Sequence, residues 1–424
     1  MAIPDTPAGK LLAAWLDAFN SNDEARAKAF VDAHKFRQSA REMVEFRNRT
    51  GGFELRGVGV NTPLEIAFTV KEKSSPVTAI GRLKLEPGTT DDATAQIAEF
   101  GLRAIPPNLT AADMDITVDA AMRARILDGI DAKLTEFYIY PPVAKKMIKA
   151  MRDHDKAGDY TAITSGAELA RKLSDDLRAV SHDGHLRVEF MPERVPEGDR
   201  DEPTPDEKDR MREELARMHC GFVAAKKLDG NIGYIKLDMF APDDICGPEA
   251  TKSFAAIEGV DAVIIDLRDN GGGQPEMVSY VASYLFAKRT HVNDLYDRKN
   301  NKTTQYWTKP DVPGTKLATQ PVYVLTSKRT FSGAEEFSYD VQTQKRATIV
   351  GETTGGGAHP TAGKRLDDHF VISVPFARPI NPITKKDWEG TGVVPDVKVS
   401  ADDALETATK LATEAIAKRA KSHK

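Results

Sequence analysis

From about residue 220 the chain alternates short apolar runs with segments of helical spacing, and this alternation constrains the fold more than any other feature. The runs GNIGYIKLDMF, VDAVIIDLRDNGGG and QPVYVLTS are rich in Val, Ile and Leu. Strands that are apolar on both faces are typical of a mostly parallel sheet that helices cover on each side. The pattern therefore predicts an α/β core, with chemically active groups in the loops at strand ends.

The rest of the chain divides at changes of pattern. Helical apolar spacing and then short alternating runs predict an N-terminal α+β domain over residues 1–106, which AIPPNLT ends. Helical spacing dominates residues 107–190, which we interpret as a helical cap subdomain, and 191–424 then forms the core. The acid-rich stretch 196–210 contains three prolines and predicts an exposed loop or linker.

Composition excludes several classes of protein. Of the 424 residues, 40% are apolar and 29% charged, as in ordinary soluble domains, which argues against disorder and against stable membrane insertion. The net charge of −5 and the absence of a basic stripe argue against nucleic-acid binding. Cys220 and Cys246 fit either one disulfide or two buried thiols. The opening MAIPDTPAGK has no leader pattern, so we expect a cytosolic protein or one whose leader has been removed.

Ser332, in LTSKRTFSGAEEF, lies between an apolar strand and a helix. With Glu335 it fits the S-x-x-E capping box, in which the serine hydroxyl caps the helix. The same position would expose the hydroxyl of a nucleophile beside the N–H groups of the helix start, which stabilise an oxyanion. The stretch alone leaves both roles open.

Two glycine-rich loops follow other strands. In IIDLRDNGGG three successive glycines suggest close approach of a ligand to the main chain, while the Asp and Arg could pair to brace the loop. GETTGGGAHPTAGK is not a phosphate loop, because Ala358 and Arg365 stand where that motif requires glycine and Ser or Thr. Lys328 and Lys364 near these loops are available as alternative bases, but we expect them to be solvated surface charges.

The segment VSHDGHLRV contains His182 and His185. Histidines three residues apart can bind a metal, but a zinc site needs three or four convergent ligands and the sequence offers no others nearby. A neutral imidazole is also the usual general base for a serine hydroxyl. Whether His359 lines a cleft or completes its loop stays open.

Four motifs together, DLRDNGGG, LTSKRTFSGAEEF, VGETTGGGAHP and WEGTGVVPDVKV, resemble the C-terminal processing (tail-specific) serine peptidases. The resemblance covers about residues 116–415 and is greatest to the branch of the tricorn protease core and the interphotoreceptor retinoid-binding protein repeats. It implies a ClpP/crotonase-like β-β-α core. Residues 1–106 faintly resemble the cystatin-like fold of the nuclear-transport-factor-2 type.

The resemblance also implies roles for particular residues. The nucleophile falls on Ser332, the histidine on His185 and the glutamate on Glu389. His182 is an alternative base. The oxyanion hole falls on the N–H groups of Gly333 and of a glycine in 271–273, with Gly272 favoured and Gly271 next. Bacterial tail-specific proteases carry a lysine 25 residues after the serine, where this chain has Gly357.

We therefore expect a serine peptidase that needs no metal or other cofactor and acts on peptides or proteins. A non-catalytic carrier of hydrophobic ligands and a small-substrate esterase or amidase are the alternatives. Too few residues separate HLRVEF from GNIGYIKL for the family's peptide-binding PDZ module. The resemblance implies a periplasmic or secreted location, with the cytoplasm as the alternative, and leaves homo-oligomerisation open.

Overall fold

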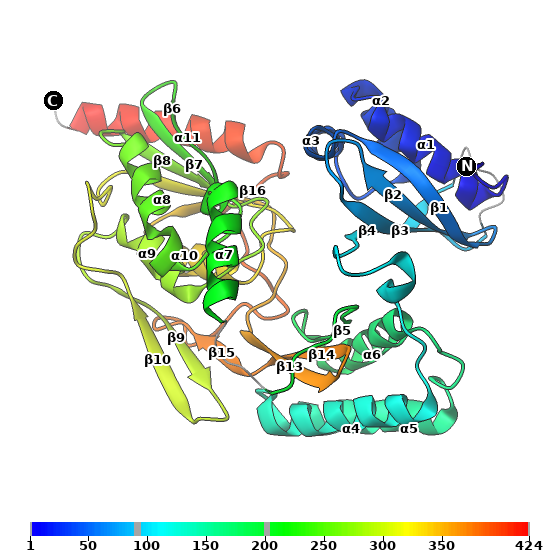
Figure 1. The fold of residues 1–424 in the computed structure, drawn as a ribbon. Coiled ribbons are helices and arrows are strands. Elements are labelled where there is room, and N and C mark those ends of the chain that lie inside the picture. Colours follow the sequence, from blue (N-terminus) through cyan, green and yellow to red (C-terminus); the bar gives the residue numbers. More distant parts are fainter. Residues whose placement is uncertain (1, 89–94, 199–203, 423–424) are drawn as a thin grey trace. The chain divides into compact units, whose positions relative to one another are not determined.

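The computed structural model describes residues 2–88, 95–198 and 204–422 (Figure 1). The fold is mixed α/β, and the chain divides into two compact units, Met1–Ile116 and Thr117–Lys424. The predicted boundary near residue 106 lies inside the first unit, between its last strand and a short 3-10 helix, Ala111–Met114.

The first unit packs three helices on one antiparallel sheet. Trp15 and Phe19 of the first helix stack with Phe53 of the first strand in its core. The predicted helix and sheet are present, but the third helix was missed, because its mostly charged surface gives a weak apolar signal and the capping box of Ser39 and Glu42 was overlooked. The elements are α1 (Pro7–Asn20), α2 (Glu24–His34), α3 (Ala40–Thr50), β1 (Phe53–Asn61), β2 (Glu65–Glu72), β3 (Thr78–Leu85) and β4 (Ile97–Ala104), with the strands in that order.

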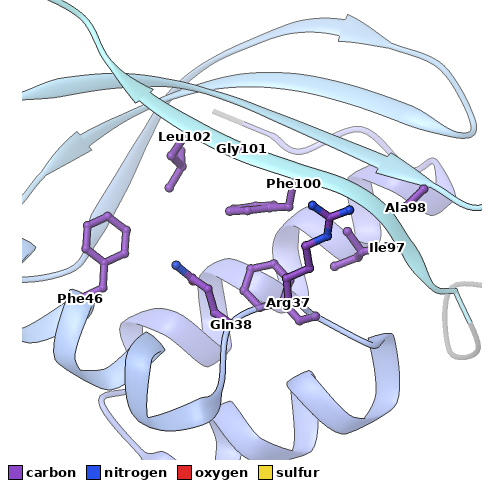
Figure 2. A pocket seen from close by; sticks show the side chains of 9 residues that line it. Arg37, Gln38, Phe46, Ile97, Ala98, Phe100, Gly101 and Leu102 are labelled. Atoms are coloured by element: carbon purple, nitrogen blue, oxygen red, sulfur yellow. The ribbon is translucent and has the colours of Figure 1, made fainter. Parts of the chain in front are cut away.

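A cavity of about 240 Å³ opens in this unit between the segment that joins α2 to α3 and the edge strand β4. Phe36 is one of its lining residues. Figure 2 shows the rings of Phe46 and Phe100 and the polar side chains of Arg37 and Gln38 around it. It belongs wholly to the first unit.

The second unit begins with the helices that the spacing predicts: α4 (Ala120–Phe137), α5 (Pro141–Ala157) and α6 (Gly166–Ser181). The strand β5 (Arg187–Phe190) follows and pairs with β14 (Phe370–Pro375), which also pairs with β13 (Thr361–Asp367). Residues far apart in the sequence thus meet in one small antiparallel sheet.

A six-stranded sheet forms the centre of this unit, in the order β16-β12-β11-β8-β7-β6, and only β6 runs antiparallel to its neighbour. One face packs against α8, α9 and α10, and the other against α11. The predicted alternation is confirmed. The bounds are β6 (Phe222–Leu228), β7 (Ile232–Leu237), α8 (Asp243–Ala256), β8 (Ala262–Asp266), α9 (Pro275–Ser283), β11 (Val322–Thr326), α10 (Gly333–Thr343), β12 (Thr348–Gly351), β16 (Val397–Lys398) and α11 (Ala404–Ser422).

A second three-stranded sheet, β10-β9-β15, contains the hairpin of β9 (His291–Asp297) and β10 (Lys302–Trp307) and the strand β15 (Ala377–Ile380). The predicted loop at 196–210 is wrong in its last part, where helix α7 (Pro205–Arg217) begins. Thr204 and Glu207 form a capping box, and a proline at the first helical position starts a helix as readily as it marks a loop.

Cys220, just before β6, and Cys246 in α8 form a disulfide across 26 residues of sequence. Of the two states that the sequence left open, the structure shows the disulfide. Across the described ranges, no helix is both long enough and apolar enough to span a bilayer.

Candidate active site

Ser332 stands at the turn between β11 and helix α10 in a strained backbone conformation, with φ 53° and ψ −121°. A non-glycine residue in this region costs about 1–3 kcal/mol and is held there only by its surroundings. Ser332 and Glu335 have the arrangement of the predicted capping box, but the hydroxyl makes no capping hydrogen bond of regular geometry to the helix. The side chain is half-buried.

Glu335 supplies the other half of the capping box and more. Its Oε2 accepts hydrogen bonds from the N–H of Ser332 at 2.9 Å and of Gly357 at 2.8 Å. Its Oε1 accepts from the N–H of Gly356 at 2.7 Å and from the hydroxyl of Thr354. Burial raises the pKa of this carboxyl, and the four donors oppose that rise. Glu335 thereby ties the serine turn to the glycine-rich loop 354–359.

The triple-glycine turn lies directly against the serine. A Cβ atom at position 272 would lie 2.7 Å from the Cβ of Ser332 and 2.8 Å from the nitrogen of Gly333, so only glycine fits there. The structure differs from the sequence prediction in one detail, because the N–H of Gly272 donates to Oδ1 of Asn270 at 2.8 Å and is therefore engaged. Among the hydrogen bonds of the described residues, none uses the N–H of Gly271 or of Gly333.

His185 follows helix α6 and places its imidazole in a largely buried position. Its main-chain N–H donates to Oδ1 of Asp183 at 3.1 Å, and its ring packs on the ring of Phe331, with centroids 4.6 Å apart. Nδ1 is buried and has no hydrogen-bond partner among the described residues. Burial lowers the pKa of His185 to about 4, although the charge of Asp183 opposes this. The imidazole is therefore neutral near pH 7, as a general base requires.

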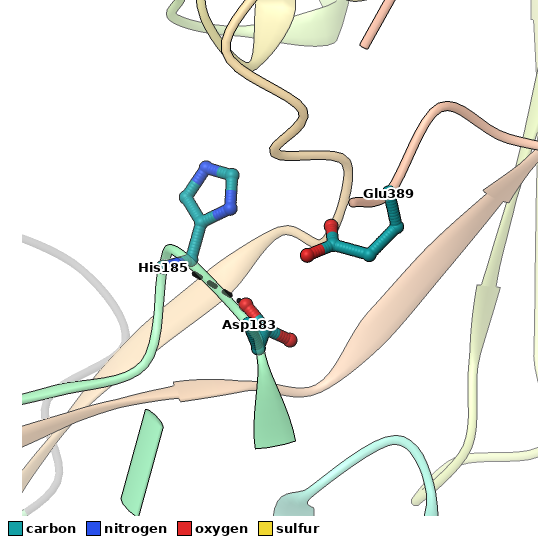
Figure 3. A group of neighbouring side chains, drawn as sticks. All are labelled: Asp183, His185 and Glu389. Carbon is teal, nitrogen blue, oxygen red and sulfur yellow. Dashed lines mark hydrogen bonds between the residues drawn. The ribbon is translucent and has the colours of Figure 1, made fainter. Parts of the chain in front are cut away.

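Glu389 reaches the same place from the turn before β16. Its Oε2 accepts from the N–H of Ala358 at 2.6 Å, and its Oε1 is buried without a partner among the described residues. One donor atom each of Asp183, His185 and Glu389 lies within 4.8 Å of the others, and Figure 3 shows the Glu389 carboxylate pointing towards the other two. Burial and the charge of Asp183 raise the pKa of Glu389 to about 7.

These three side chains also have the donor types that could hold a metal ion. Atoms bonded to a zinc ion at about 2.0–2.2 Å lie about 3.3–3.6 Å from one another in a tetrahedral site, and the spacings here are at most 4.8 Å. The sequence could not show this grouping, because Glu389 comes from a distant segment. The same arrangement suits an imidazole that a carboxylate orients.

The serine and the histidine are linked through Phe331 rather than by a direct hydrogen bond. Phe331 precedes Ser332 and its ring contacts the imidazole of His185. A Cβ atom at position 357 would lie 2.7 Å from Cε1 of His185 and 2.1 Å from Cζ of Phe331. Gly357 therefore leaves room for both rings.

The other basic candidates lie elsewhere. His182 is exposed and ends helix α6 in a left-handed conformation, with φ 55°. Lys328 is exposed as predicted, with its ammonium 4.0 Å from Glu352. The prediction for Lys364 is wrong, because this residue is buried and its ammonium lies 4.7 Å from the centre of the Phe137 ring. The aliphatic stem of a lysine can be covered in this way, which composition alone does not reveal.

Two residues that the sequence analysis left without a role complete the site. His359 is buried, and its Nδ1 bonds to Oδ2 of Asp183 at 2.7 Å. Tyr138 directs its hydroxyl to the same oxygen at 3.4 Å. The signal for this cluster in the sequence is the position of Asp183 between His182 and His185.

The Asp and Arg of the first glycine loop pair, which the sequence allowed, with Arg268 2.7 Å from Asp266.

Two family models match segments of this chain. Residues 231–399 match the model of peptidase family S41, and residues 109–219 match the N-terminal domain of peptidase S41 in eukaryotic IRBP. Both segments thus match peptidase family S41.

Two curated relatives are similar to part of this chain. It is 28% identical over 185 residues to carboxyl-terminal-processing peptidase 2, chloroplastic, of Arabidopsis thaliana, covering 42% of this chain and 33% of that protein. It is 29% identical over 168 residues to the carboxyl-terminal-processing protease of Synechocystis, covering 39% and 37%. The chain thus spans little more than a third of the length of these relatives.

A solved structure of a putative peptidase from Parabacteroides merdae is 19% identical to this chain, with a TM-score of 0.48. The superposition covers 68% of this chain and 96% of that one.

Proposed function

We propose that this chain is a serine peptidase in which Ser332 is the nucleophile, His185 the general base and Glu389 the carboxylate that orients it. The observation that carries the proposal is that Nδ1 of His185 and Oε1 of Glu389 are both buried and unpartnered among the described residues, while one ligand atom of each side chain lies within 4.8 Å of the other. Buried polar atoms are rarely left unpaired, and those that are often belong to functional sites.

In the proposed mechanism the Ser332 hydroxyl attacks the carbonyl carbon of the scissile amide while His185 takes its proton. The negative charge that forms on the carbonyl oxygen is held by the free N–H groups of Gly271 and Gly333, in place of the predicted Gly272. His185 then returns the proton to the leaving amine, and a water molecule hydrolyses the acyl-enzyme by the same steps. Loss of one such oxyanion donor costs about 3–4 kcal/mol in the barrier.

The hydroxyl and the imidazole must approach one another when substrate binds. Catalytic hydrogen bonds are often long in the free enzyme and tighten in the complex. The contact between His185 and Phe331 sets the present position of the imidazole, so we propose that a substrate side chain or main chain displaces the Phe331 ring.

Several finer features belong to the same proposal. The central sheet with its helices is of the ClpP/crotonase type, and the first unit is cystatin-like. Substrates are peptides or proteins. The location is periplasmic or secreted, which the disulfide between Cys220 and Cys246 supports, since such bonds persist in oxidising compartments. Assembly into homo-oligomers is open to measurement by light scattering.

A fluorophosphonate probe tests the central claim. Labelling of Ser332, mapped by mass spectrometry, should disappear in Ser332→Ala and His185→Ala. Ser39→Ala is a matched control, because Ser39 occupies the same place in a capping box of the first unit. His182→Ala is the matched histidine control. The probe concentration should be one that labels a known serine peptidase. If the unaltered chain is then not labelled at any pH between 5 and 9, the result favours a ligand carrier. If it is labelled and cleaves small esters but not peptides, the result favours an esterase.

A further inference from the structure

We propose that His359 is a positioning residue for this reaction: held as an imidazolium between Asp183 and Glu389, it favours the ionised form of the Glu389 carboxylate and keeps this carboxylate turned towards His185. The inference rests on the proposed function and adds a charge to it. It assigns a role to a histidine that neither attacks the substrate nor exchanges a proton with it.

The geometry places one basic ring between two acids. Nδ1 of His359 lies 2.7 Å from Oδ2 of Asp183 and 3.5 Å from Oε2 of Glu389. The three side chains are only 3%, 1% and 17% exposed, respectively. Across the described ranges, no other basic side chain forms an ion pair with either carboxylate.

Burial makes the charge of His359 decisive. Two buried carboxylates without a cation repel each other, and one of them then takes up a proton. If that proton sits on Glu389, the carboxyl can no longer balance the imidazolium that forms on His185 during catalysis. If it sits on His359, both acids stay ionised and the cluster carries one negative charge.

The balance of forces favours the second arrangement. Burial lowers the pKa of His359, but the hydrogen bond and charge of Asp183, with the charges of Glu389 and Asp387, raise it above the ordinary value. The buried Nε2, without a partner among the described residues, acts with burial against the charge. The other neighbouring groups, the ring of Tyr140 and the hydroxyl of Tyr138, are neutral; their own pKa values are raised.

The loop that carries His359 fixes it in place. Successive residues of this loop bind three carboxylates: Gly356 and Gly357 donate to Glu335, Ala358 donates to Glu389, and His359 bonds to Asp183. The imidazole is thus held by the same short segment that holds the carboxylate it is proposed to serve.

The protonation state can be observed directly in the full, unaltered chain by ¹⁵N NMR of the histidine rings, with His359→Gln and His185→Gln used for assignment. We expect His359 to be protonated on both nitrogens at pH 7 and His185 to be neutral. A neutral His359 at pH 7 would overturn the proposal. This measurement does not depend on catalysis, so it stands even if no peptidase activity is found.

The functional consequence is read from the rate of fluorophosphonate labelling of Ser332 against pH. In His359→Gln the rise in labelling rate near pH 7, where Glu389 ionises, should move to a higher pH by about one unit or more, because Asp183 and Glu389 then compete for one proton. Adding Asp183→Asn should move it back. A loss that is equal at every pH would show that His359 only fills space and would overturn the charge role. If His359→Gln does not fold, substitution of the other eight histidines assigns the His359 signal by elimination, and the NMR result on the unaltered chain decides.

Discussion

Replacing Glu335 by glutamine changes one atom at the junction between the serine turn and the glycine-rich loop. In the structure each carboxylate oxygen accepts two hydrogen bonds. A glutamine side chain offers one oxygen and one NH₂ group. The NH₂ group must therefore replace one of the two carboxylate oxygens, and it cannot accept the two hydrogen bonds that this oxygen accepted. The better orientation puts the NH₂ group towards Thr354, whose hydroxyl can also accept, and leaves the N–H of Gly356 unpaired.

The expected cost follows from that count. An unsatisfied buried N–H costs about 1–3 kcal/mol, and hydrogen bonds to a charged group contribute about 1.5–3 kcal/mol each. We therefore expect Glu335→Gln to lower the free energy of unfolding by about 2–4 kcal/mol. Because Gly357 lies against His185, the loosened loop should also lower kcat/KM by about tenfold or more, equivalent to at least about 1.4 kcal/mol in the barrier.

Urea unfolding and the rate of Ser332 labelling measure the two effects. Glu42→Gln is the matched control, since Glu42 is the third residue of another capped helix and its carboxylate accepts from the N–H of Ser39, a bond that an amide oxygen can keep. That control should change stability by less than about 0.5 kcal/mol. If Glu335→Gln behaves like the control in both assays, the reasoning that Glu335 holds the site together is wrong.

Three further predictions address the base, the free space and the disulfide. The pH profile of kcat/KM should rise in two steps, near pH 4, where His185 becomes neutral, and near pH 7, where Glu389 ionises, rather than in one step at an ordinary histidine value. In Glu389→Gln only the step near pH 4 should remain. A single step near about 6.5 in both proteins would contradict these assignments. Gly357→Ala should reduce the labelling rate of Ser332 at least about a hundredfold, equivalent to about 2.7 kcal/mol, because the added methyl group overlaps the rings of Phe331 and His185. An unchanged labelling rate would mean that the imidazole is not held where the structure has it. Removing the disulfide by Cys220→Ser with Cys246→Ser should lower the unfolding free energy by about 3–4 kcal/mol for a loop of 26 residues, measured by urea unfolding under non-reducing conditions, and an unchanged midpoint would show that the bond contributes nothing.

Most of the core could be predicted from periodicity, because the apolar strands and the helices between them each satisfy a local rule. Helix α3 was not predicted, because its residues are mostly polar or charged and its start is marked only by the pair Ser39 and Glu42. The start of α7 was misread because proline serves both loops and first helical turns. A local signal of this kind is compatible with two structures, and tertiary contacts determine which of them forms.

The candidate site was predictable only in part. The motifs pointed to Ser332, His185 and Glu389, and the structure groups the last two within 4.8 Å, while their catalytic roles remain proposals. The pairing of His359 with Asp183 could not be predicted, because it joins segments 176 residues apart. The engagement of the Gly272 N–H by Asn270 is local, but it depends on a side-chain conformation that the sequence does not specify. The pKa of His185 also differs from the value of a free imidazole, because its burial is a property of the fold.

The way the loop 354–359 meets its carboxylates limits how this region can change. Consecutive main-chain groups serve Glu335 and Glu389, so the length of the segment matters more than most of its side chains. Deleting or inserting a single residue would shift every one of these pairings at the same time, and no compensating side chain could restore them together. Variation in natural or engineered versions of this region should therefore come as substitutions rather than as changes in length.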